Sequence, residues 1–326
     1  MSTQIRVFVV AAVTLPILAA TSTSAFGQNV TLQYRWTKGE ETRYRFVQQS
    51  TATVAGLPGF TSSVIETNMS EVVRTAVDDV AADGAATLRY VYESARWETR
   101  TPMGTTVVDT TSTDPTGTGV PNGIKDVLAA MVGETFVAVV APTGQVQKVD
   151  GLDRIVEKMF KSIPTDPSTA AMIETLKSSF NAEWMQNTLT QGSAQFPDRP
   201  LTPGDTWDKS ATATNPLVGR QTTTTQFTLK DVETSSGSRV ARIAMRVTTQ
   251  PPEEPTGGLA GLKMRLTDDS GEGDLVFDVT NGRLLRSTTH VTMSFDMSAP
   301  APDGTAMNMS GKVTTSMSAE LLQPTN

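Results

Sequence analysis

Cysteine is absent from this chain of 326 residues, and histidine occurs once, at His290. Without thiols there is no disulfide, no thiolate nucleophile, no thiolate metal site and no cysteine for a lipid anchor. One imidazole and no thiol cannot supply the usual ligands of a zinc site. Any histidine-dependent catalytic group would have to form around His290, which narrows the enzyme classes open to this chain.

Long apolar segments are missing too, apart from one run near the start, from Val7 to Ala20. Its roughly 14 residues are too few for a helix that crosses a hydrocarbon core, which needs about 20. Arg6 precedes the run, and small residues follow it up to Ala25, which is typical of a cleavable signal peptide. We expect residues 1–25 to be removed and the protein to be periplasmic or secreted, with no lipid anchor and no membrane segment.

Positive charge is in deficit, with 27 lysines and arginines against 34 aspartates and glutamates, a net charge of −7 at pH 7. A moderately acidic surface favours solubility and disfavours nucleic acid and anionic lipid headgroups as partners. The sequence contains no basic patch with interleaved aromatic residues. We therefore expect no nucleic acid among the partners.

Two blocks of strand-like sequence, residues 30–113 and 205–321, occupy the two ends of the predicted mature chain. Both are rich in threonine and valine and are divided by turns that contain glycine or proline. The first strand is predicted to carry Tyr34 and Trp36 on one face. Near the other end, Asn281-Gly282 predicts a hairpin with a type I′ turn.

The middle of the chain, residues 123–190, changes to a helical period. A hairpin at 136–149 comes before the strongest amphipathic helix pattern in the chain. Its apolar positions are Leu152, Ile155, Val156, Met159, Phe160 and Ile163. Two further helices are predicted, one from Ile124 to Met131 and one that begins at Asp166-Pro167.

Strands on both sides of a helical centre predict an α+β fold rather than a series of βαβ units. We expect one large, curved antiparallel sheet, similar to a half-barrel, covered on one face by helices from the middle of the chain. Two packed antiparallel sheets are the alternative, because a sheet of about ten or more strands must curl, split or close. We treat residues 26–326 as a single domain.

The polar groups that suggest chemistry all have simpler interpretations. Strand alternation places His290 on a polar face, which favours a surface position over a catalytic base. The acidic run Asp268–Asp274 resembles the start of a calcium loop but has Val279 where a bidentate glutamate is required. The pairs Asp78-Asp79 and Glu253-Glu254 point to opposite faces if extended. We predict no catalytic, cofactor-binding or metal-ligating residue and no enzymatic activity.

Methionines are the remaining candidates for function. Several of the 14 recur at even separations in the last predicted strands, which places them on one sheet face. They are Met293, Met297, Met307, Met309 and Met317, and Phe295 lies among them. Flexible thioethers line cavities that accept varied apolar ligands, and they also fill ordinary cores, so the pattern leaves both interpretations open.

Three short motifs occur at boundaries between the predicted elements. They are Leu32-x-Tyr34-x-Trp36-x-x-Gly39-Glu40, Pro142-x-Gly144-x-Val146 and Pro203-Gly204-Asp205-x-Trp207. Together they resemble a family of exported bacterial proteins known only as a domain of unknown function, and they carry no catalytic residues. In its order of elements the chain also distantly resembles carriers of the lipoprotein-localisation type, whose half-barrel holds acyl chains beneath helices.

These features predict a non-enzymatic exported binding protein that holds a lipid or another apolar small molecule between a curved sheet and helices. The alternative is an envelope scaffold that binds an envelope protein through its surface and sheet edges. A hydrolase is a third hypothesis, and it requires carboxylates that converge in a pocket. No cofactor is expected.

Overall fold

The computed structural model of the chain describes residues 29–56, 62–112, 128–161, 177, 185–186, 189–190, 194–215, 219–235, 237–250, 263–300 and 306–323. The predicted signal peptide lies outside the described residues. The pair Glu253-Glu254 and the start of the predicted helix at Asp166-Pro167 lie outside them as well. Residues 177, 185–186 and 189–190, near the end of that predicted helix, are helical.

Every strand of the described residues belongs to one antiparallel sheet. The strands are β1 (Glu41–Ala55), β2 (Ser62–Val80), β3 (Ala86–Thr101), β4 (Gly104–Asp109), β5 (Thr135–Val140), β6 (Val146–Asp150), β7 (Thr206–Asn215), β8 (Gly219–Ser235), β9 (Ser238–Gln250), β10 (Lys263–Asp278), β11 (Arg283–Pro300) and β12 (Ala306–Leu321). Their order across this sheet of 12 strands is β6-β5-β3-β2-β1-β12-β11-β10-β9-β8-β7, and β4 pairs with β3. Because β1 pairs with β12, the two strand blocks join at the centre of the sheet. The antiparallel sheet is confirmed, and the alternative of two packed sheets is wrong.

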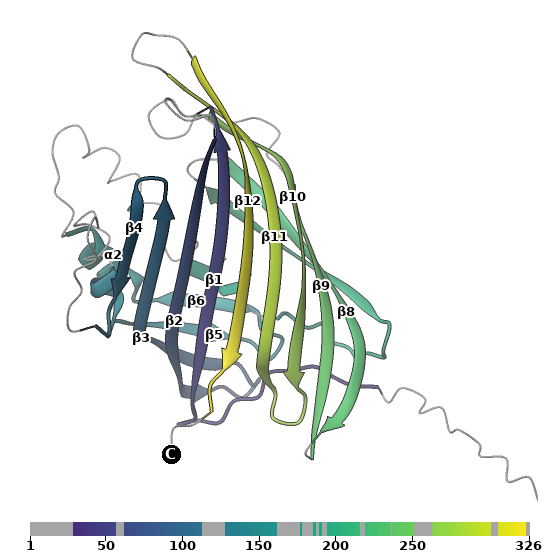
Figure 1. Ribbon diagram of the computed structural model, residues 1–326. Coiled ribbons are helices and arrows are strands. Elements are labelled where there is room, and N and C mark those ends of the chain that lie inside the picture. Colours follow the sequence, from purple (N-terminus) through teal and green to yellow (C-terminus); the bar gives the residue numbers. More distant parts are fainter. Residues whose placement is uncertain are drawn as a thin grey trace, which may run out of the picture.

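The sheet is bent, as Figure 1 shows: the long strands β1, β2 and β8–β12 run side by side, β5 and β6 lie behind them, and α2 (Leu152–Lys161) lies at the left of the view. We call the face against which α2 packs the inner face, and the opposite one the outer face. Leu152 and Ile155 of α2 pack with Leu88 of β3 and Phe136 of β5. The amphipathic pattern therefore predicted both the helix and its buried side.

Two glycines leave room for large inner-face side chains of the neighbouring strands, Met245 beside Gly273 and Phe295 beside Gly311. A Cβ atom at Gly273 would meet the carbonyl oxygen of Thr288 and lie 2.9 Å from Cε of Met245. A Cβ atom at Gly311 would meet the ring of Phe295. Bulges in β10 and β3 add local bends to these closely paired strands.

The predicted first strand is wrong. Residues 31–37 are extended but pair with no strand, and the N–H of Tyr34 donates to the carbonyl of Pro142 at 2.7 Å. The ring of Tyr34 belongs to the cluster on β8–β10, whereas Trp36, stacked on it at 5.5 Å between ring centroids, belongs to the cluster on β2, β3 and β5. Alternation alone cannot distinguish this connecting segment from a strand, because both are extended.

The hairpin predicted at Asn281-Gly282 is confirmed, but its turn is wider than a type I′ turn. Asp278 pairs with Arg283, so residues 279–282 form the loop. The N–H of Gly282 donates to the carbonyl of Asp278 at 2.8 Å. The buried Asp278 carboxylate also accepts from the N–H of Asn281 at 2.9 Å and from its side-chain amide at 2.6 Å. This carboxylate stabilises the wider loop, an effect that a dipeptide rule omits.

Helix makes up less of the described chain than the predicted α+β class implies. Besides α2, a helical turn is described at 128–131, at the end of the helix predicted from Ile124, in addition to the helical residues 177, 185–186 and 189–190. The coverage of the sheet by helices is confirmed in part. Besides α2, Leu128 packs with Ala95 of β3, and Met185 belongs to the cluster on β2, β3 and β5. Among the residues that the structure describes, no helix is long and apolar enough to cross a membrane.

Candidate functional site

The two faces of the sheet differ in chemistry. On the outer face, Arg246, Glu272 and His290 lie opposite one another on β9, β10 and β11. On the inner face of β11, Met293 and Phe295 pack into an apolar cluster. Strand alternation alone produces this contrast, since neighbouring residues point to opposite faces. The predicted surface position of His290 is confirmed, because its side chain is exposed.

Packed clusters close the inner face towards one end of the sheet. The larger one joins the segments 29–36 and 194–201 to β7–β10, and it includes Phe196 and Phe277, both 0% exposed. A second cluster joins α2 to β2, β3, β5 and β6. Towards the far end, Leu266 and Phe295 form a small cluster on β10 and β11.

Between these clusters two large apolar side chains of the inner face are partly exposed. Phe46 on β1 and Met317 on β12 are each 39% exposed, although both lie on the apolar face. Gln48 lies opposite Met317 on one side and Met69 on the other, and Met317 also lies opposite Thr289. We call Phe46, Gln48, Met69, Thr289 and Met317 the central trough.

A carboxyl group borders the central trough. Glu71 lies directly opposite Phe46 and has no ion-pair partner among the described residues. Burial raises the pKa of the Glu71 carboxyl above its ordinary value of 4.5. Burial also raises the pKa of Tyr92, and the charge of Glu71 adds to that rise. The border of the trough is thus least polar when Glu71 is protonated.

The substitution Glu71→Gln should stabilise the protein at pH 7. A carboxyl whose pKa is raised by folding binds its proton more tightly in the folded state, so stability falls as pH rises above about 4.5. The amide removes this loss, and we expect the melting temperature at pH 7 to rise by roughly 2 °C. Thermal melts of both proteins from pH 4 to pH 8 measure the effect. The control Glu66→Gln alters a glutamate paired with Arg100 at 3.6 Å and should not reproduce the rise.

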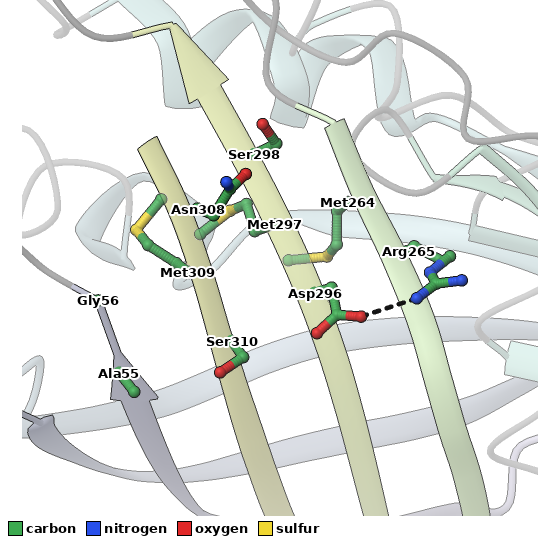
Figure 2. A pocket seen from close by; sticks show the side chains of 10 residues that line it. All are labelled: Ala55, Gly56, Met264, Arg265, Asp296, Met297, Ser298, Asn308, Met309 and Ser310. Carbon is green, nitrogen blue, oxygen red and sulfur yellow. Dashed lines mark hydrogen bonds and ion pairs between the residues drawn. The ribbon is translucent and has the colours of Figure 1, made fainter. Parts of the chain in front are cut away.

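A pocket of about 470 Å³ lies at the far end of the sheet, where β10, β11 and β12 each contribute one methionine (Figure 2). Met297 lies directly opposite Met264 on one side and Met309 on the other. We call these three residues the methionine row. The other lining residues are Ala55, Gly56, Arg265, Asp296, Ser298, Asn308 and Ser310.

The prediction that evenly spaced methionines lie on one face of the sheet is confirmed, but it did not include every methionine of the pocket. Met297 and Met309 lie on the same face, as their even spacing predicted, and line one pocket. Met264 was missed, because its position beside Met297 depends on the pairing of β10 with β11. A bulge between Leu266 and Asp268 shifts that register, and no local pattern in the sequence reveals it.

The adjacent aspartates Asp78 and Asp79, which the sequence also offered as candidates, lie in β2. Asp78 pairs with Arg89 at 2.6 Å, and Asp79 pairs with Lys38 at 3.0 Å, so the two carboxylates have separate cationic partners. Neither contributes to a converging pair of acidic groups.

The acidic run Asp268–Asp274 forms part of β10 rather than a calcium loop. Two of its carboxylates, on Glu272 and Asp274, line an outer-face hollow of about 500 Å³ together with His290. All three side chains are exposed. In the described part of the chain, no three acidic or histidine side chains are close enough to hold a metal ion. The exposed position lacks the exclusion of water that strengthens acid–base chemistry.

Comparison with known proteins identifies a family. A family model described as "Family of unknown function (DUF6263)" matches residues 83–283. No curated protein matches the chain.

Solved structures resemble the chain only distantly. Lipovitellin, at 8% identity and a TM-score of 0.47, matches 90% of this chain, which spans only 26% of the lipovitellin chain. DynF from the dynemicin biosynthesis pathway of Micromonospora chersina, at 9% identity and a TM-score of 0.21, matches 92% of this chain and 88% of its own. An outer membrane channel from Pseudomonas putida F1, at 8% identity and a TM-score of 0.24, matches 92% of this chain and 98% of its own. Likenesses this distant carry no argument about function.

Proposed function

Because this chain belongs to a family of unknown function (DUF6263), we propose its function from its own structure: a non-enzymatic exported binding protein that holds a lipid or another apolar ligand on the inner face of its curved sheet. The observation that supports this proposal is the exposure of Phe46 and Met317 on an apolar face that is packed towards both ends. Exposed apolar side chains that lie together in one patch mark binding sites more often than exposed apolar side chains scattered singly over a surface.

The energetics favour an apolar occupant of the central trough. Full burial of a phenylalanine or methionine side chain stabilises a complex by about 1.5–3 kcal/mol relative to exposure. Methionine adapts its shape to different ligands, because it is unbranched and has three rotatable bonds. Gln48 and Thr289 supply polar atoms beside Met317, which suits an amphiphile better than a pure hydrocarbon.

Export and domain organisation form part of the same proposal. The sequence before Ala25 supports export, and the mature residues 26–326 are taken as one domain. We also propose that helices of the middle segment, in addition to α2, cover the inner face. The ligand would then lie between sheet and helices.

Substitution of the central trough should weaken ligand binding. Phe46→Asp or Met317→Asp places a charge where an apolar chain would lie, and we expect at least a tenfold loss of affinity, which corresponds to about 1.4 kcal/mol. The measurement is titration of the mature protein with a solvatochromic dye, accompanied by native mass spectrometry for lipid retained from the cells.

Two matched controls carry the same change on the outer face. Val47→Asp and Ser316→Asp each lie one residue from a trough position and point to the opposite face, so dye binding should be unchanged. Circular dichroism checks that all four variants fold. A folded mature protein that retains no lipid and takes up no dye would rule out the proposal. Recovery of an envelope protein instead, by pull-down, would favour the scaffold alternative.

A further inference from the structure

The methionine row differs from an ordinary core contact in its alignment. Met264, Met297 and Met309 occupy directly opposite positions on three adjacent strands. Directly opposite residues of antiparallel strands have their Cβ atoms about 4.5–5.5 Å apart. Figure 2 shows the three side chains lining one pocket, one from each strand. Since each methionine side chain has three rotatable bonds, the outer two sulfurs can turn towards a point above Met297.

The three thioether sulfurs of the row form a set of soft metal ligands. Sulfur is a soft ligand, and methionine and cysteine select soft ions such as Cu(I) over the hard ions Mg²⁺ and Ca²⁺. The chain has no cysteine, and its one histidine lies on the outer face. The methionine row places three soft donors at directly opposite positions on adjacent strands.

The other polar residues that line the pocket do not offer what a hard cation needs. They alternate with the methionines along the strands, so they point to the outer face, opposite the methionine row. The one carboxylate among them, on Asp296, pairs with the guanidinium of Arg265 at 2.9 Å. Asn308, Ser298 and Ser310 contribute only neutral oxygen and nitrogen atoms. A Ca²⁺ site takes six to eight oxygen ligands, usually with several carboxylates.

The surroundings also suit a weakly hydrated ion. Leu266 and Phe295 pack beside Met264 and Met297, so one side of the row is closed by apolar side chains. Met309 is 7% exposed, which keeps its sulfur largely away from water. A soft cation such as Cu(I) or Ag(I) loses less hydration on entering such a site than a hard divalent ion does.

We propose that Met264, Met297 and Met309 form a thioether binding site for a soft monovalent cation, Cu(I) or Ag(I). The site lies at the far end of the inner face, away from Phe46 and Met317. It is independent of the proposed apolar ligand, because it depends on sulfur atoms rather than on apolar surface.

Titration with Ag⁺ tests the site, since silver is a soft cation that needs no reducing agent. Native mass spectrometry and calorimetry of the mature protein in chloride-free buffer should show one Ag⁺ per chain. Met297→Leu keeps the apolar volume but removes the central sulfur, and we expect at least a tenfold loss of affinity. Met264→Leu should produce a similar loss, which protects the test against misfolding of one variant. Exchanges between methionine and leucine usually cost less than about 1.5 kcal/mol of stability.

Two methionines outside the row serve as controls. Met103→Leu alters a side chain that is 89% exposed in the turn between β3 and β4, and Met317→Leu alters the central trough. Both variants should bind Ag⁺ like the unmodified protein. Three results would each overturn the proposal. They are no binding of Ag⁺ by the unmodified protein, binding of Ag⁺ by Met297→Leu as tight as that of the unmodified protein, and a loss of Ag⁺ affinity in a control variant as large as the loss in Met297→Leu.

Outcomes for the two proposals can be separated. Met297→Leu should leave dye binding in the central trough intact, while Phe46→Asp should leave Ag⁺ binding intact. Loss of both activities in every variant would indicate unfolding, which circular dichroism detects.

Discussion

Replacement of Phe277 by alanine should lower the free energy of unfolding by about 3–5 kcal/mol, the range for large aromatic side chains deleted from packed cores. The Phe277 ring is 0% exposed and meets the ring of Phe196 edge-on at 4.6 Å between centroids. It also meets the ring of Tyr34 at 5.3 Å. These partners belong to the segments 29–36 and 194–201, so the substitution removes contacts that join both segments to β10.

Chemical denaturation followed by tryptophan fluorescence measures the Phe277→Ala effect. Trp207 lies in the same cluster and stacks on Phe227 at 5.4 Å, so its emission reports on this region. The matched control is Phe46→Ala, the same change at a side chain that is 39% exposed on the same face. We expect it to cost less than about 1 kcal/mol. Equal losses in both variants would show that the segments are held by other contacts.

The substitution Gly273→Ala should destabilise the protein by about 1–3 kcal/mol, the usual cost of overpacking. Alanine in a strand interior is ordinarily better than glycine by roughly 0.5–1 kcal/mol, so the expected sign is reversed. The reason is the close pairing of β10 with β11: a Cβ atom would meet the carbonyl oxygen of Thr288 and lie 3.0 Å from Cα of Thr289. Backbone atoms cannot rotate away as the end of a side chain can.

Thermal or chemical denaturation of Gly273→Ala, compared with Ser270→Ala, measures this cost. Ser270 lies three residues away on β10, is exposed and points to the outer face, so its substitution should change stability by less than about 0.5 kcal/mol. Neutral or stabilising behaviour of Gly273→Ala would mean that the two strands separate easily at this point.

Local patterns predicted several elements correctly because their physical cause is local. Helix α2 follows from apolar residues every three or four positions, and its buried residues Leu152, Ile155 and Phe160 belong to that pattern. The motif that begins at Pro203-Gly204 forms a turn just before β7, at an element boundary as predicted, and the N–H of Thr202 donates to the Asp205 carboxylate at 2.8 Å within it. Side-chain caps of this kind act over a few residues, which keeps them visible in the sequence.

Errors arose where distant partners decide the outcome. The extended segment with Tyr34 and Trp36 has the alternation of a strand, yet its backbone bonds with a loop at Pro142. The row of Met264, Met297 and Met309 requires two strand pairings and a bulge, all fixed by contacts between separate parts of the chain. Register is specified by burial of one face against the rest of the fold, and no single strand contains that information.

The sequence by itself determined the polar and apolar faces of the strands, the amphipathic helix, the acidic charge and the absence of thiol chemistry, because these depend on residue identity and local spacing. Only the tertiary structure decided that β1 pairs with β12, that Phe46 and Met317 stay exposed, and that three methionines share a row. Exposure and alignment depend on which strands become neighbours. That choice is made by the packing of the whole sheet, whose free energy is spread over the whole chain.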